Sequence, residues 1–111
     1  MIRPNSSSSS NVQQAAHAFR VYVDQHIPGF DGDDVEARVR SALEQGASAL
    51  VNHDGDSVDL TAIVFRSPVD GDVMYTCSVH AQRVDPDTVT VRVENHACST
   101  GDVEILVEDI I

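Results

Sequence analysis

The sequence contains no lysine and no tryptophan, and its aromatic residues amount to 5% of the chain. With so few aromatic rings, a core must be built mainly from Val, Ala, Leu and Ile, and the β-branched members of this group favour a pleated sheet. Apolar residues still make up 41% of the 111 positions, an ordinary share for a globular protein. A chain of this length is expected to form one domain that buries a core without help from disulfides or metals.

The sequence also has few cysteines and no long apolar run. Cys77 and Cys98 are too few to form a disulfide framework. Residues 1–11 lack the apolar stretch of a signal peptide. No apolar run approaches the roughly 20 residues that span a bilayer. From these absences we expect a cytoplasmic protein that does not enter a membrane.

Negative charge dominates the chain, since eighteen Asp and Glu residues against seven arginines give a formal net charge of −11 at pH 7. This charge disfavours direct binding to nucleic acid or to an anionic membrane, because both carry the same sign. An Asp-rich chain without lysine resembles, in composition alone, the proteins of salt-loving organisms. The acidity therefore has two interpretations, adaptation to the solvent or docking to a basic protein surface.

The beginning of the chain is rich in serine, with five in a row at Ser6–Ser10. Such a run buries too little apolar surface to offset the entropy of ordering it, so residues 1–10 are predicted to form a disordered tail. Residues 11–111 are then expected to form a single α+β domain.

Two helices are predicted before the middle of the chain. Apolar residues at helical spacing predict the first from about Asn11 to Ile27. Asp33 and Glu36 stand in the relation of a capping box and mark the start of the second, and Gly46 is a natural C-cap.

From Ala47 onward the hydrophobic period changes from 3.6 residues to 2. Turn signals at residues 54–56, 67–71, 85–87 and 99–101 divide this part into five strands. The predicted fold is therefore α+β, with two N-terminal helices packed on one face of a five-stranded antiparallel meander as a two-layer sandwich. A hairpin centred on Pro86 sets His80 opposite Arg92, and the next turn brings Arg92 near Glu108.

One strand, which starts near Val58, breaks the alternation, because two of its apolar residues lie on the parity opposite to the rest. A regular strand would place an apolar strip on the open face of the sheet, formed by Ile63, Phe65, Met74 and Leu106. A β-bulge near Ile63 would instead turn Ile63 and Phe65 inward. Both alternatives remain open at this point.

Few patterns in the sequence could carry chemistry. Cys77-x-x-His80 and His96-x-Cys98 resemble a zinc set, but Cys77 and His80 have opposite strand parity, so neither a metal site nor a cofactor is predicted. The open face gathers charged side chains in which His80 with Glu94, or His96 with Glu104, would form an acid–base pair. Cross-strand charge pairs on a solvated sheet explain the same pattern.

No nucleophile elbow, phosphate-binding glycine loop or HExxH helix occurs. We therefore expect a non-enzymatic acidic binding or regulatory protein that engages a protein partner or a second copy of itself. Its sharper form is an inhibitor that competes with nucleic acid for a basic surface, as anti-defence proteins do. The residues expected to bind the partner are Ile63, Phe65, Met74, Leu106, Arg92, Glu94, Glu104 and Glu108.

Two other functions fit the sequence. The first is a small enzyme or ligand-binding domain with a pocket between sheet and helices, close to Tyr22 and His26. The second is a haloadapted protein whose acidity is only solvent adaptation. Salt separates the second from an inhibitor, because a haloadapted protein loses structure in dilute buffer and an inhibitor loses its partner at high salt.

Overall fold

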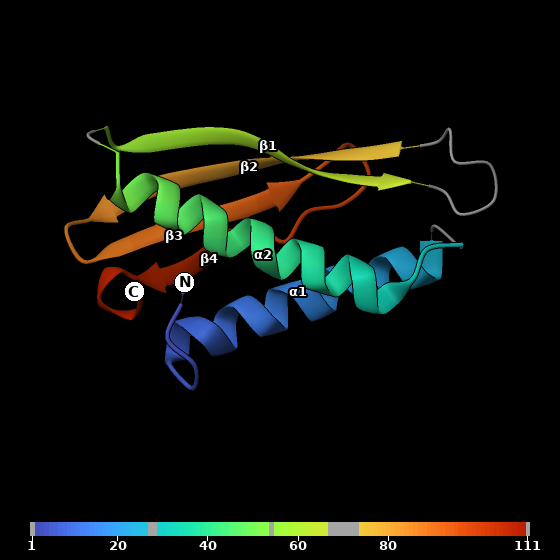
Figure 1. Ribbon diagram of the computed structural model, residues 1–111, viewed down its shortest axis with the longest axis horizontal. Coiled ribbons are helices and arrows are strands. Elements are labelled where there is room, and N and C mark those ends of the chain that lie inside the picture. The colour runs from blue at the N-terminus through green and yellow to red at the C-terminus, as the bar shows by residue number, and fades with distance from the viewer. Residues whose placement is uncertain (1, 27–28, 54, 67–73, 111) are drawn as a thin grey trace.

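The computed structural model describes residues 2–26, 29–53, 55–66 and 74–110. Two helices cover one face of an antiparallel sheet, which confirms the α+β class (Figure 1). The elements are α1 (Ser7–His26), α2 (Gly32–Val51), β1 (Ser57–Arg66), β2 (Met74–Asp85), β3 (Thr88–Glu94), β4 (Val103–Leu106) and the 3-10 helix η1 (Val107–Asp109). In the described part of the chain the sheet has four strands in the order β1-β2-β3-β4, so the prediction of five is wrong.

Helix α1 begins inside the serine run, and this differs from the predicted disordered tail. Ser6 caps the helix, because its Oγ accepts a hydrogen bond from the Ser9 amide at 3.0 Å. Ser8 is buried and Ile2 forms a β-bridge with Ile110. The serine run has little apolar surface of its own to bury, but its contacts with the C-terminal end of the chain hold it in an ordered conformation.

Helix α2 is longer than the sequence predicts and runs through residues that were expected to form the first strand. Asp31 is the N-cap, and its carboxylate accepts from the amides of Asp33 and Asp34. The helix extends past Gly46 to Val51 because the apolar spacing of 3.6 residues continues beyond this glycine. Residues 47–51 are therefore helical, and the missing fifth strand is the last turn of α2.

Gly46 lies within α2 rather than at its C-cap, where the sequence placed it. The glycine is buried against the sheet, and a Cβ atom at this position would lie 2.8 Å from Val79 Cγ1 and 2.9 Å from Val91 Cγ1. Such distances are shorter than real Cβ contacts. Gly46 is thus required by the close approach of the helix to β2 and β3.

The register of β2 and β3 matches the prediction, since His80 pairs with Arg92, and the neighbouring Val79 pairs with Val93. The register of β3 and β4 does not, because Val91 pairs with Val103. The connection between these strands folds into a turn in which the amide of Asn95 donates to the Cys98 carbonyl at 2.9 Å. The predicted approach of Arg92 to Glu108 is therefore wrong.

The core lies between the helices and the inner face of the sheet. Its described residues are almost wholly aliphatic, as the shortage of aromatic residues implies, with Phe19 fully buried among them and Phe30 partly buried against them. The largest fully buried side chains are Phe19, Leu43, Leu50, Ile105, Val12, Val35, Val39, Val79, Val89, Val91, Val93 and Cys77. Among the described helices, neither has the length and apolar character needed to cross a bilayer.

Strand β1 contains the bulge that the sequence left as an alternative. Thr61 pairs with Ser78 and Ile63 pairs with Cys77, so Ala62 is the extra residue. Beyond the bulge Ile63 faces the helices, and its side chain is 3% exposed. The prediction that Ile63 lies on the open face is wrong.

The outer edge of β4 is covered by α1, which lies beside it (Figure 1). Ser8 Oγ accepts a hydrogen bond from the Leu106 amide at 2.8 Å. Asn11 Nδ2 donates to the Glu104 carbonyl at 3.1 Å. Two backbone groups of β4 thus bond to helix side chains instead of to another strand.

Candidate functional site: the open face of the sheet

The face of the sheet that the helices leave uncovered is polar, as the two-residue alternation requires. We call this surface the open face, and its described residues are Asp59, Thr61, Thr76, Ser78, His80, Gln82, Thr88, Thr90, Arg92, Glu94, Glu104 and the half-buried Leu106. The residues lie in cross-strand rows, one of which runs from Asp59 through His80 to Arg92. Side chains from all four strands therefore meet on this surface.

A chain of ion pairs crosses the open face. His80 Nδ1 lies 2.5 Å from Asp59 Oδ1, and His80 Nε2 lies 3.2 Å from Glu94 Oε1. Arg92 continues the chain, with Nε 3.2 Å from Glu94 Oε2 and Nη1 3.3 Å from Asp102 Oδ1. Arg92 Nε is close to the carboxylate but makes no aligned hydrogen bond in the described structure. The chain thus holds three carboxylates against one arginine and one histidine.

The ring of His80 lies between two carboxylates. Each of its nitrogens faces a carboxylate oxygen, one from Asp59 and one from Glu94. These side chains are partly exposed, so each pair contributes at most about 1 kcal/mol to the free energy of folding. Their chief effect is to fix the positions of the charges.

Negative charge is concentrated in the half of the sequence that forms the sheet. Residues 54–111 contain twelve acidic residues and three arginines, a net charge of −9. Residues 1–53 contain six acidic residues and four arginines, a net charge of −2. The helical layer is thus nearly neutral, and most of the net charge belongs to the strands and their turns.

Four of the residues that the sequence proposed for partner binding share the open face, namely Arg92, Glu94, Glu104 and Leu106, and the other four are not shown to join them. Glu94 and Arg92 lie on the open face with His80, and the predicted neighbourhood of His80 and Glu94 is present. Glu104 is exposed in β4, Glu108 is exposed in η1, and Leu106 is half-buried at the end of β4. Ile63 is buried under α2, and the side chains of Phe65 and Met74 lie outside the described part of the structure.

Sequence reasoning missed two members of the ion-pair chain, Asp59 and Asp102. Asp59 has the parity of the open face, but the register of β1 against β2 could not be set from the long turn between them. Asp102 was missed because the predicted turn before β4 was too short. The exposed Val84 was also missed, since it is the extra residue of a second bulge between Arg83 and Asp85.

Both thiols are held in their neutral form. Burial raises the pKa of Cys77, although the hydrogen bond from Asn95 Nδ2, 3.6 Å from Sγ, acts in the opposite direction. Burial and, to a smaller extent, the charge of Cys77 raise the pKa of Cys98 to about 11. Because the thiolate is the reactive form, neither cysteine is activated as a nucleophile. Within the described residues no group of three His, Cys, Asp or Glu side chains could hold a metal ion.

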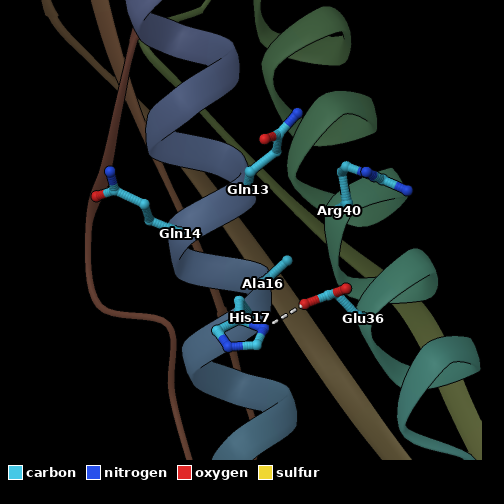
Figure 2. A pocket seen from close by; sticks show the side chains of 6 residues that line it. All are labelled: Gln13, Gln14, Ala16, His17, Glu36 and Arg40. Carbon is cyan, nitrogen blue, oxygen red and sulfur yellow. Dashed lines mark hydrogen bonds and ion pairs between the residues drawn. The ribbon is translucent and has the colours of Figure 1, made fainter.

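A second candidate surface is the groove of about 360 Å³ between α1 and α2. His17 Nδ1 lies 2.8 Å from Glu36 Oε1 and joins the two helices. Figure 2 shows these two side chains directed toward each other and Gln14 directed away from α2. The polar groups of the groove therefore do not converge on one point, as those of a ligand pocket do.

Tyr22 and His26, the residues predicted to lie close to a pocket between sheet and helices, are at exposed positions. The rings of Tyr22 and His26 stack near the end of α1 with centroids 4.4 Å apart, and both residues are exposed. Neither residue lines the grooves that the described residues form between the helices, at β1 or at β4. Comparison with known proteins found no matching family model, no matching curated protein and no matching solved structure.

Proposed function

We propose that this chain is a non-enzymatic acidic protein that binds a basic protein partner through the open face of its sheet. The observation that carries the proposal is the uneven charge, −9 in the half of the sequence that forms the sheet and −2 in the half that forms the helices. On the open face itself Asp59, Glu94 and Glu104 outnumber Arg92, and the exposed Asp56, Asp87 and Asp102 adjoin its strands. A surface with an excess of one sign attracts a partner of the other sign and accelerates its association.

The dimensions of the open face suit a protein partner. The four strands contain 10, 12, 7 and 4 residues, and at about 3.4 Å per residue and about 4.8 Å between strands they span on the order of 500 Å² before side chains and turns are added. A standard interface buries about 800 Å² on each partner. The face and its rim therefore approach the size of a whole interface, whereas a small ligand needs an enclosing pocket.

The sharper form of the proposal concerns the partner's own ligand. A surface rich in carboxylates carries the same sign as a phosphate backbone, so both compete for one basic groove. In this form the protein is an inhibitor that displaces nucleic acid from its partner.

The test captures partners from the source cells with three versions of the protein. The first is the wild type, and the second carries Asp59→Asn, Glu94→Gln and Glu104→Gln on the open face. The third is a matched control in the helical layer, with Asp24→Asn and Glu44→Gln as well as Asp34→Asn. Both variants lose three negative charges, and both remove partners of surface ion pairs.

A basic protein that binds the wild type and the helical control, but binds the open-face variant at least tenfold more weakly, supports the proposal. Equal weakening by both variants would show that only net charge matters and would overturn the assignment of the face. Addition of duplex DNA to the purified complex then tests the inhibitor form, which requires that DNA and this protein displace each other.

A further inference from the structure

The two edges of the sheet differ in whether their backbone groups are covered by other parts of the chain. The β4 edge is occupied by side chains of α1, as described above. Strand β1 is ten residues long, and in the described part of the chain it pairs with β2 alone. An edge strand presents a row of backbone amides and carbonyls that another extended chain can use. The β1 edge is therefore the place where the sheet can be extended.

A notch of about 160 Å³ adjoins this edge, between β1 and α2. The bulge residue Ala62 and the buried Ile63 line it on the strand side, and Ala42 lines it on the helix side. Ser41 and Gln45 lie on the exposed side of the helix and are bonded to each other at 3.2 Å. The notch is several times the ~30 Å³ that a water molecule occupies in the liquid, so it has room for a small aliphatic side chain.

We propose that an extended segment of the basic partner adds to β1 as a further strand and places one aliphatic side chain in this notch. The inference rests on the proposed function and specifies how the partner is held. Alternate residues of an added strand point to opposite faces of the sheet. One set would lie beside Asp59 on the open face, and the other set would face α2 and the notch.

The charge near this edge determines the chemistry of the segment. Asp56 and Asp59 are exposed on or just before β1, and the Asp59 side chain remains 76% exposed although its Oδ1 is paired with His80. Arg38, which also lines the notch, is paired with Asp34 at 2.8 Å. Basic residues are therefore favoured on the open face, opposite Asp59. Apolar residues are favoured on the other face, against Ala62 and Ile63. The recognised segment thus alternates basic and small aliphatic residues.

A second copy of this chain is a poorer occupant of the same edge. Pairing two β1 strands would bring together two molecules that each carry a net charge of −11. The bulge at Ala62 also opposes the pairing of two β1 strands, because bulges in edge strands discourage unwanted pairing. A partner that fits the edge must therefore gain from charge and from the notch as well as from backbone hydrogen bonds.

The test uses the full chain labelled with 15N and the synthetic peptide Arg-Val-Arg-Val-Arg-Val-Arg, blocked at both ends. The expected result is saturable binding with the largest shifts in the amides of residues 57–63 and 38–45. Two further peptides carry N-methyl groups, one on every valine and the other on every arginine. Only one set of amides faces β1 in an added strand, so one of these peptides should bind at least tenfold more weakly and the other should bind almost normally.

A protein variant tests the notch itself. Ser41 is exposed, so Ser41→Phe should keep the fold while its ring fills the notch, and the affinity for the alternating peptide should fall at least tenfold. Ser10→Phe is the matched control, because Ser10 is exposed on α1, which packs beside β4. This variant should bind as the wild type does.

The outcomes separate this inference from the proposed function. Shifts confined to His80, Arg92 and Glu104, with equal binding of both methylated peptides, would overturn strand addition and leave the open face as the binding surface. Absence of any peptide binding would also overturn strand addition, while capture of a partner that depends on the open face would still support the proposed function. Self-association through β1, seen as a dimer in solution, would replace the partner by a second copy.

Discussion

The bond between Ser8 and Asp109 offers a direct test of whether the serine run is part of the folded domain. Ser8 Oγ donates to Asp109 Oδ2 at 2.6 Å and accepts from the Leu106 amide at 2.8 Å. Ser8 is 1% exposed and Asp109 is 6% exposed. Replacement of Ser8 by Ala would leave the buried Asp109 carboxylate without this donor and the partly buried Leu106 amide without its acceptor.

The expected cost of Ser8→Ala follows from these two bonds. A hydrogen bond to a charged group contributes about 1.5–3 kcal/mol, and an unsatisfied buried amide costs about 1–3 kcal/mol. The two terms overlap, so we expect a loss of about 3 kcal/mol in the free energy of unfolding. This is a large share of the ~5–15 kcal/mol that stabilises an ordinary domain. It corresponds to a fall of roughly 12 °C or more in the melting temperature.

The measurement is urea unfolding followed by circular dichroism at pH 7, with the slope of the transition compared between proteins. Ser7→Ala is the matched control, because Ser7 is exposed one position earlier in the same helix. A change of no more than about 0.5 kcal/mol is expected there. Deletion of residues 1–9 should cost at least as much as Ser8→Ala. If Ser8→Ala and the deletion both unfold like Ser7→Ala, the serine run is disordered in solution and its contact with Asp109 does not stabilise the fold.

Three further predictions concern other parts of the fold. Gly46→Ala should lower the free energy of unfolding by about 1–2 kcal/mol despite the better helix propensity of alanine, because overpacking costs more than the propensity gains. In the control Gly32→Ala, the added methyl group meets only the flexible side chain of Arg20, so this variant should be almost neutral. Equal unfolding of the two variants would contradict the close helix–sheet contact. Asp31→Ala removes the N-cap of α2 and should cost about 1 kcal/mol in the same assay, and an unchanged midpoint would show that the cap does not form. Cys98 should react with iodoacetamide at pH 8 more slowly than an unfolded thiol, because its pKa is higher in the folded protein. For the same reason the free energy of unfolding should keep its full value below pH 9 and decline as the pH rises toward about 11. A Cys98→Ser variant with the same alkaline decline would assign that decline to other groups.

The parts of the fold that the sequence predicted depend on local, repeated patterns. The alternation in residues 74–94 and the turn at Pro86 were enough to set His80 opposite Arg92. The apolar faces of the helices also follow from spacing, as with Val35 and Val39. These features repeat over several residues, so one exception does not hide them.

The errors arose where a contact distant in the sequence overrides a local signal. Gly46 has the chemistry of a helix end, but the helix continues because Ala47 and Leu50 bury themselves against the sheet. Ser8 has the chemistry of a disordered tail, but it is bonded to Asp109, 101 residues away. The bulge at Ala62 was recognised as an alternative, and tertiary packing of Ile63 decides in its favour.

The difference between the two edges of the sheet also limits how many molecules can assemble on it. An assembly that grows without end needs two complementary edges on every unit, one to join the preceding unit and one to receive the next. Here the bonds from Ser8 and Asn11 occupy the β4 edge, so a molecule joined at β1 offers no second strand edge among its described residues. If a strand adds to this sheet, β1 is therefore the edge among the described residues that can receive it. A fibre built by strand addition would first have to detach the start of α1 from β4.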